Sequence, residues 1–219
     1  MSAVAAPMPK PKPSRRSKSS ARWLQEHVSD EYVKRARQEG WRSRAVYKLE
    51  EIQKADRILK PGQLVIDLGA APGAWSQYAA RQLGSKGEVI AVDLLPMDSL
   101  DGVYFIQGDF REQPVLDQVL ARVAGRPVDL VMSDMAPNLS GLDVVDQPRA
   151  MYLTELALDF ARQVLKPRGH LLAKVFQGSG FQELVATTRQ AFDDVRLRKP
   201  QASRARSAEM YLLAKGFRL

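Results

Sequence analysis

From residue 63 onwards the sequence alternates short apolar segments with longer amphipathic segments, and this alternation restricts the possible folds more than any other feature. Short runs rich in Val, Ile and Leu are typical of buried strands, whereas the longer segments repeat their apolar residues at helical spacing. The predicted strands are residues 63–69, 88–95, 103–109, 128–134, 170–176, 194–200 and 209–217. The predicted helices between them are residues 75–84, 114–125, 147–169 and 181–192.

This order of elements predicts an α/β fold with a mostly parallel seven-stranded sheet and helices on both faces. A helix between two strands brings the second strand back parallel to the first. No helix separates the last two predicted strands, so we expect them to pair antiparallel and to place an antiparallel strand at the edge of the sheet. Ligands of such sheets bind outside the carboxyl ends of the strands.

The region before the sheet contains two predicted helices, over residues 29–40 with Ser29 as the N-cap and over residues 43–59. Residues 1–21 differ from the rest, because they hold five basic residues, four prolines and no acid. We therefore expect a disordered basic tail over residues 1–21 and a single domain over residues 22–219. A basic tail favours a polyanionic partner, with nucleic acid before an anionic membrane, although such tails also serve simply to keep a protein in solution.

Several classes of site are excluded by what the composition lacks. The chain has no cysteine, which rules out disulfides and thiolate nucleophiles, and its two histidines, His27 and His170, make a histidine metal site unexpected. We expect no bound metal. No apolar run approaches the roughly 18 residues that a membrane span needs. We therefore expect a cytoplasmic protein with no membrane partner, and a monomer without an obligate protein partner.

The segment DLGAAPGAW, residues 67–75, follows the first predicted strand and indicates a ligand-binding turn. Its glycines, Gly69 and Gly73, allow the backbone to approach a ligand closely, but the dinucleotide pattern G-x-G-x-x-G is absent. Asp93 ends the second strand, where an acid accepts hydrogen bonds from ribose hydroxyls. Asp109 ends the third strand, where an acid can accept from an adenine amino group. Together they fit an adenosine without a pyrophosphate, such as S-adenosylmethionine.

Four charged residues occupy positions that an apolar core disfavours. Lys174 lies in the middle of the apolar strand 170–176, Asp134 ends the strand 128–134, and Glu209 opens the last strand. Lys48 lies near the apolar face of the helix predicted over residues 43–59. A buried charge is unfavourable unless it is paired or functional. Each residue alone is better explained by a snorkelling side chain or a salt bridge than by a function.

In this order the four residues resemble the catalytic set of the FtsJ-type ribose 2′-O-methyltransferases of ribosomal RNA. The surrounding sequences are similar as well: RSRAVYKL, DLGAAPGAWSQ, DLLPMD, QGDF, SDMAPNLSG, LLAKVFQG and KPQASRARSAEMY. The resemblance extends from about Trp23 to the C-terminus and leaves out the tail.

This resemblance implies a class I S-adenosylmethionine-dependent methyltransferase fold, which is Rossmann-like. It also implies methyl transfer to the ribose 2′-hydroxyl of a uridine in the A-loop of 23S rRNA, within the maturing large ribosomal subunit. The implied catalytic residues are Lys48, Asp134, Lys174 and Glu209, with Lys174 as the proton acceptor. The implied cofactor contacts are Gly73, Trp75, Asp93, Asp109 and Asp134.

Three alternatives remain open from the sequence. The same chemistry could act on a tRNA or an mRNA cap, the chain could be a non-catalytic RNA-binding assembly factor, or it could be a nicotinamide oxidoreductase. The last is disfavoured by the missing pyrophosphate pattern. Failure to bind S-adenosylmethionine would favour the assembly factor.

The role of Lys174 also stays open from the sequence. A ribose hydroxyl is a poor nucleophile, and a base that takes its proton accelerates transfer roughly 10²–10⁴-fold. The neutral amine is favoured by burial and by the neighbouring charge of Lys48, and the ammonium form by Asp134 and Glu209. As an ammonium, Lys174 would instead stabilise the developing alkoxide. The predicted phosphate contacts for RNA are Arg42, Arg44, Lys199, Arg204 and Arg206, unless these lie in merely solvated loops.

Overall fold

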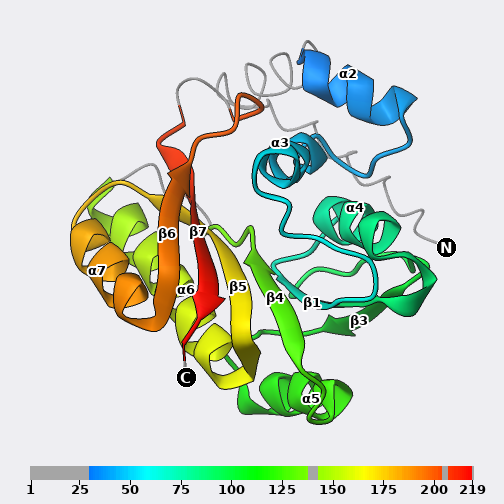
Figure 1. The fold of residues 1–219 in the computed structure, drawn as a ribbon. Helices are drawn as coiled ribbons and strands as arrows, with labels where there is room; N and C mark the ends of the chain where they lie inside the picture. The colour runs from blue at the N-terminus through cyan, green and yellow to red at the C-terminus, as the bar shows by residue number, and fades with distance from the viewer. Residues whose placement is uncertain (1–29, 138–142, 204–206, 219) are drawn as a thin grey trace, which may run out of the picture.

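The computed structural model describes residues 30–137, 143–203 and 207–218 of the 219-residue chain. Its centre is a seven-stranded sheet in the order β3-β2-β1-β4-β5-β7-β6 (Figure 1). The strands are β1 Leu64–Leu68, β2 Glu88–Asp93, β3 Val103–Gln107, β4 Val128–Ser133, β5 Leu165–Phe176, β6 Phe192–Arg198 and β7 Glu209–Phe217. The predicted tail over residues 1–21 lies outside the described residues.

Strands β1 to β5 pair in parallel, and β7 pairs antiparallel with both β5 and β6. The mostly parallel seven-stranded sheet is therefore confirmed, and so is the antiparallel pairing of the last two strands. The predicted place of the antiparallel strand is wrong in one respect, because the edge strand is β6 and β7 lies one place further in. A helical crossover carries the chain from β5 to β6 and leaves a gap, which β7 fills on its return.

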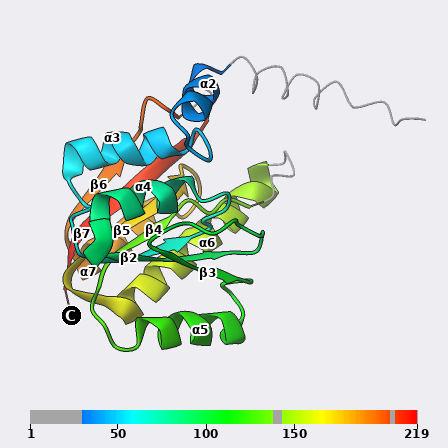
Figure 2. The ribbon, with the colours of Figure 1, turned by 90° about the vertical axis from the view of Figure 1, so that its right-hand side faces the viewer.

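Helices cover both faces of the sheet (Figure 2). They are α2 Glu31–Gln38, α3 Val46–Asp56, α4 Ala74–Leu83, α5 Gln113–Val123, α6 Asp143–Val164 and α7 Phe181–Ala191, with a 3₁₀ turn at Gly84–Lys86. Apolar residues of α2, α3 and α4 form one core cluster with one face of the strands. Those of α5, α6 and α7 form a second cluster with the other face. Successive residues such as Val65 and Ile66 enter opposite clusters, as the two-residue period of a strand requires.

Several boundaries differ by a few residues from those predicted, and two of the differences have a clear cause. Helix α2 is capped by Asp30, whose side chain accepts a hydrogen bond from the Tyr32 amide at 3.0 Å, while the predicted cap Ser29 lies outside the described residues. Helix α6 ends at Val164 rather than Gly169, because Leu165 already pairs with Val128 in the sheet. Across the part of the chain that the structure describes, no helix is long and apolar enough to cross a membrane.

Candidate active site

The four charged residues singled out by the sequence form two ion pairs at the carboxyl end of the sheet. Lys174 Nζ lies 2.8 Å from Asp134 Oδ1 and donates a second hydrogen bond to the Asp134 carbonyl at 2.9 Å. Lys48 Nζ lies 2.7 Å from Glu209 Oε1. The exposed fractions of these side chains are only 8% for Lys174, 17% for Asp134 and 12% for both Lys48 and Glu209. Both pairs are thus largely shielded from water, where charge interactions are strong.

Tyr211 lies between the two ion pairs. Its hydroxyl donates a 2.7 Å hydrogen bond to Asp134 Oδ1, and Lys48 Nζ is 5.8 Å from the centre of its ring. Tyr211 also faces Lys174 directly in the β5–β7 ladder. Tyr211 was not among the residues predicted for the site. Because side chains two residues apart on a strand share a face, the position of Tyr211 after Glu209 was the available signal.

The electrostatics of the cluster favour two ionised carboxylates and a neutral phenol. Burial alone would raise the pKa of Asp134, but the charges of Lys174 and Lys48 bring it below its ordinary value. Burial opposes the ionisation of Glu209 too, and Lys48 outweighs it to lower the pKa of Glu209. Burial and the charges of Asp134 and Glu209 hold the pKa of Tyr211 well above its ordinary value. Tyr211 therefore remains a hydrogen-bond donor at neutral pH.

A cavity of about 660 Å³ opens beside this cluster, at the carboxyl ends of β1 to β4. Its walls include three of the five residues implied as cofactor contacts, Asp93, Asp109 and Asp134. Gly73 and Trp75 do not line it. The Trp75 indole is buried, donates to the Ala45 carbonyl at 2.9 Å and packs against the Tyr211 ring at 5.5 Å between centroids. Trp75 thus supports the ion-pair cluster from behind rather than facing the cavity.

Asp93 and Asp109 shape the cavity through hydrogen bonds of their own. Asp93 accepts from the amides of Ala71 and Leu95, at 2.9 and 2.8 Å, and so ties the loop after β1 to the loop after β2. Asp109 is held by Arg111, whose Nη2 lies 2.6 Å from Oδ2. The hydrogen bonds from Arg111 lower the pKa of Asp109. A carboxylate has about four acceptor sites, so Asp93 can still accept from a ligand, whereas both oxygens of Asp109 are already occupied by Arg111.

These residues fit an adenosine-type cofactor. The volume lies within the range of roughly 300–1,000 Å³ usual for small-molecule sites. Asp93, at the end of β2, presents acceptors for the hydroxyl groups of a ribose. At Gly69, with φ of 77°, an added Cβ would lie 2.6 Å from Met135 Cγ, and Met135 lines the cavity. The loop therefore reaches the cavity wall only because residue 69 has no side chain.

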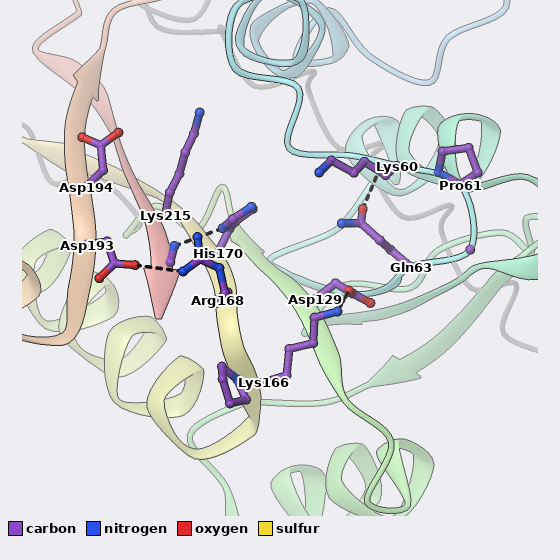
Figure 3. Close-up of a pocket in the computed structure, with 13 residues that line it drawn as sticks. Lys60, Pro61, Gln63, Asp129, Lys166, Arg168, His170, Asp193, Asp194 and Lys215 are labelled. Carbon is purple, nitrogen blue, oxygen red and sulfur yellow. Dashed lines mark hydrogen bonds and ion pairs between the residues drawn. The ribbon is translucent and has the colours of Figure 1, made fainter. Parts of the chain in front are cut away.

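A second hollow of about 740 Å³ lies at the opposite end of the parallel strands from the ion-pair cluster (Figure 3). Lys60 and Gln63 border it just before β1, and Lys166 borders it at the start of β5. Most of its cations have acidic partners: Lys166 pairs with Asp129 at 2.5 Å and Arg168 with Asp193 at 3.9 Å, and Lys215 pairs at 3.0 Å with Asp56, which lies outside the lining. None of the residues of the ion-pair cluster borders it, so it is separate from the candidate site.

The sequence profile of the FtsJ-like methyltransferase family matches residues 41–217. The chain belongs to this family. Members of the FtsJ-like methyltransferase family use S-adenosylmethionine as the methyl donor, in agreement with the cavity. Across residues 30–137, 143–203 and 207–218 the structure contains no group of three or more His, Cys, Asp or Glu side chains that could hold a metal ion.

Individual relatives are similar over nearly the whole chain. Two proteins named ribosomal RNA large subunit methyltransferase E, from Marinobacter nauticus and Chromohalobacter salexigens, are 61% and 62% identical to it. Each alignment covers 93% of this chain, with 99% and 97% of the respective relative. A crystal structure of a ribosomal RNA methyltransferase from Plasmodium falciparum superposes with a TM-score of 0.74 and 29% identity. That alignment covers 81% of this chain and 98% of the other.

In this FtsJ-like methyltransferase the predicted RNA contacts are mostly engaged within the protein. Arg42 binds backbone carbonyls, and Arg44 binds the side chain of Asp30 and the carbonyl of Ala202. Lys199 Nζ donates to the Glu209 carbonyl at 2.6 Å, which helps to place Glu209. Arg204 and Arg206 lie outside the described residues. Arg42, Arg44 and Lys199 thus have partners within the protein, and their contact with RNA phosphates stays a prediction.

Asp67 provides a test of the electrostatics beneath the site. It is fully buried at the end of β1, and its Oδ2 accepts a 2.6 Å hydrogen bond from Ser76. Burial raises the pKa of Asp67 to about 7, and the charges of Asp134 and Asp93 add to the effect. The folded protein thus binds a proton that the unfolded chain releases near pH 4.

Because folding takes up this proton, Asp67 makes the protein lose stability as pH rises from about 4 to about 7. We expect Asp67→Asn, which keeps an acceptor for Ser76, to remove this slope. The wild-type free energy of unfolding should fall relative to the variant by up to roughly 4 kcal/mol over that range, at about 1.4 kcal/mol per pKa unit. Denaturant unfolding at pH 5, 6, 7 and 8 measures the difference. A constant difference would show that Asp67 has an ordinary pKa.

Tyr211→Phe tests the bond between the phenol and Asp134. The change removes one hydrogen bond to a buried carboxylate, so we expect a loss of about 1–2 kcal/mol in the free energy of unfolding and about tenfold in methyl transfer. Tyr104→Phe, on the exposed edge of β3, is the matched control and should leave both unchanged. Equal values for the Tyr211→Phe variant and wild type would show that Asp134 is oriented by Lys174 alone.

Proposed function

We propose that this chain transfers a methyl group from S-adenosylmethionine to the ribose 2′-hydroxyl of a uridine in the A-loop of 23S rRNA, during maturation of the large ribosomal subunit. The observation that carries the proposal is the pair of shielded ion pairs, Lys174–Asp134 and Lys48–Glu209, on either side of Tyr211 and beside the cofactor cavity. Relatives named ribosomal RNA large subunit methyltransferase E, which align with 93% of this chain, support the choice of substrate.

The cofactor would be held by Asp93, Asp109 and Asp134, with Gly73 and Trp75 supporting the walls. When bound, it supplies a methyl group on a positively charged sulfur, which an oxygen nucleophile can attack. The protein has two tasks: it must place the ribose hydroxyl in line with that methyl group, and it must remove the hydroxyl proton. Good placement alone lowers the barrier substantially.

The proton is assigned to Lys174 Nζ. Asp134 aims this nitrogen through two contacts, and Tyr211 in turn fixes the Asp134 carboxylate. Lys48, held by Glu209, would place a positive charge beside the hydroxyl oxygen as it becomes negative. Once Lys174 has taken the proton, the cluster holds two cations and two anions and has no net charge, so its burial is less unfavourable than that of any one member.

The proposed partner is 23S rRNA within the large ribosomal subunit, and the proposed place of action is the cytoplasm, where that particle would be found. We further propose that residues 22–219 act as one domain and one monomer, without an obligate protein partner. The two core clusters on opposite faces of a single sheet support one domain. The basic tail over residues 1–21 would add affinity for RNA without base specificity.

Methyl transfer to different RNAs tests the substrate. Purified protein and labelled S-adenosylmethionine are incubated with large ribosomal subunits from cells lacking this modification, with tRNA and with capped RNA. We expect incorporation into the large subunits only. Preferred methylation of tRNA or capped RNA would replace the rRNA assignment with the same chemistry on another RNA. Failure to bind the cofactor at all would favour a non-catalytic assembly factor.

A further inference from the structure

Arg42, predicted from the sequence to contact RNA, instead binds three backbone carbonyls of the protein. Its Nη1 donates to the carbonyls of Pro72 and Asp98, at 3.1 and 2.9 Å, and its Nη2 donates to the carbonyl of Ser99 at 2.9 Å. Hydrogen bonds from a charged donor are among the stronger ones in proteins. One side chain thus joins two loops that lie far apart in the sequence.

Both loops belong to the cofactor cavity. Pro72 lies in the loop after β1, next to Ala71, which lines the cavity. Asp98 and Ser99 lie in the loop between β2 and β3, whose first residues, Leu94 and Leu95, line the cavity as well. On the cavity side the same two loops are joined by the Asp93 carboxylate, which accepts from the Ala71 amide. The same two loops are therefore joined twice. Asp93 joins them at the cavity, and Arg42 joins them outside it.

The loops are closely packed where Arg42 joins them. A Cβ added at Gly73 would lie 2.6 Å from Met97 Sδ and 2.9 Å from Arg42 Nη1. Gly73 also has a φ of 100°, a conformation that other residues rarely adopt. The sequence resemblance implies a cofactor contact for Gly73, but here its missing side chain allows Arg42 and Met97 to close against the loop.

Arg42 also connects these loops to the helix that carries Lys48. Gln77 of α4 accepts from the Arg42 amide at 3.1 Å and donates to the Gly40 carbonyl at 2.9 Å, so the segment before α3 is fixed on α4. Helix α3 begins at Val46, which places Lys48 in its first turn. The position of Lys48 is thus linked through a short segment to the cofactor loops.

We propose that Arg42 is a positioning residue, which sets the shape of the cofactor site and its alignment with Lys48 and does not bind RNA phosphate. The planar guanidinium suits this role, because its fixed fork of five donors can reach several carbonyls at once. A lysine at this position has the same charge but a single nitrogen, and cannot span three carbonyls on two loops. The expected effect on cofactor binding assumes only that the chain binds S-adenosylmethionine, as its family does. The alignment with Lys48 rests on the proposed function.

Titration calorimetry of S-adenosylmethionine into the full chain without RNA tests the proposal. We expect Arg42→Ala and Arg42→Lys both to weaken cofactor binding by about tenfold or more, since charge without the fork is insufficient. Arg37→Ala, on the exposed face of α2, is the matched control and should bind as wild type. Thermal unfolding identifies variants that fail to fold, and Arg42→Lys, the milder change, then carries the test.

If Arg42 contacts RNA phosphate instead, the opposite results are expected. In that case the folded Arg42→Ala variant would bind the cofactor as tightly as wild type, Arg42→Lys would resemble wild type throughout, and Arg42→Ala would lower the dependence of RNA affinity on salt. Wild-type cofactor affinity in both Arg42 variants would overturn the proposal. If instead the wild type binds the cofactor but methylates no rRNA, the proposed substrate fails while the test of Arg42 in cofactor binding stands.

Discussion

Replacement of Lys174 by alanine should reduce methyl transfer by roughly 10²–10⁴-fold, the range usual for loss of a positioned general base. Lys174 is the most buried of the four charged residues, and its nitrogen is held by Asp134, which lines the cavity. It does not line the cofactor cavity, so affinity for S-adenosylmethionine should change by no more than about twofold. Single-turnover methyl transfer and calorimetry of the cofactor measure the two effects separately.

Lys166→Ala is the matched control for this experiment. Lys166 belongs to the same strand and also pairs with an aspartate, Asp129, but it is more exposed and lies at the opposite end of the strand. We expect that variant to methylate as wild type does. Near-normal turnover in Lys174→Ala would remove Lys174 from the reaction.

The pH dependence of the rate distinguishes the two roles open to Lys174. A base acts as the neutral amine, so the single-turnover rate should rise with pH and this rise should be absent in Lys174→Ala. A cation that stabilises the alkoxide acts only while protonated, so the rate should fall once the ammonium loses its proton. If the Lys174→Ala variant lacks a rise of rate with pH, Lys174 is a base. If the variant lacks a fall of rate with pH, Lys174 is a stabilising cation.

The second large effect is expected from Asp134→Asn, which should lower both the free energy of unfolding and the rate of methyl transfer. The change leaves the ammonium of Lys174 largely buried without its counter-charge, while the carbonyl of Asn can still accept from Tyr211. Removing one partner of a buried pair costs about 3–5 kcal/mol, and we expect a value near the lower end. Methyl transfer should fall by at least roughly 10²-fold, because Lys174 loses its orientation.

The matched control for Asp134→Asn is Glu31→Ala, which breaks the exposed ion pair with Lys34 on α2. Exposed pairs contribute about 0–1 kcal/mol, so this variant should unfold almost as wild type does. Denaturant unfolding at neutral pH gives both values. Equal stability of Asp134→Asn and wild type would mean that Lys174 does not depend on Asp134 for its charge.

Patterns within one segment were enough to predict most of the fold. The strand and helix periods identified every element of the sheet, and the missing helix before the last strand predicted its antiparallel pairing. The position of β7 between β5 and β6 could not be predicted in this way, because it depends on which strands pair after the chain has folded. The end of α6 was missed for the same reason, since Leu165 leaves the helix to pair with Val128.

The charged residues of the site could be named from the sequence, but their partners could not. The pairing of Lys48 with Glu209 joins the first and last parts of the domain, and no local pattern encodes it. The basic residues show most clearly that the partners of a side chain cannot be predicted from its charge. Arg42 and Arg44 look like RNA contacts by charge alone, yet their donors meet carbonyls and a carboxylate from distant loops.

The position of the added methyl group tests the central claim most directly. Large ribosomal subunits lacking the modification are methylated by the purified protein, the RNA is digested to nucleosides, and the labelled nucleoside is identified by mass spectrometry. We predict 2′-O-methyluridine from a single site in 23S rRNA, and none from the Lys174→Ala variant. A methyl group on a base, or equal labelling by that variant, would contradict the proposed ribose chemistry.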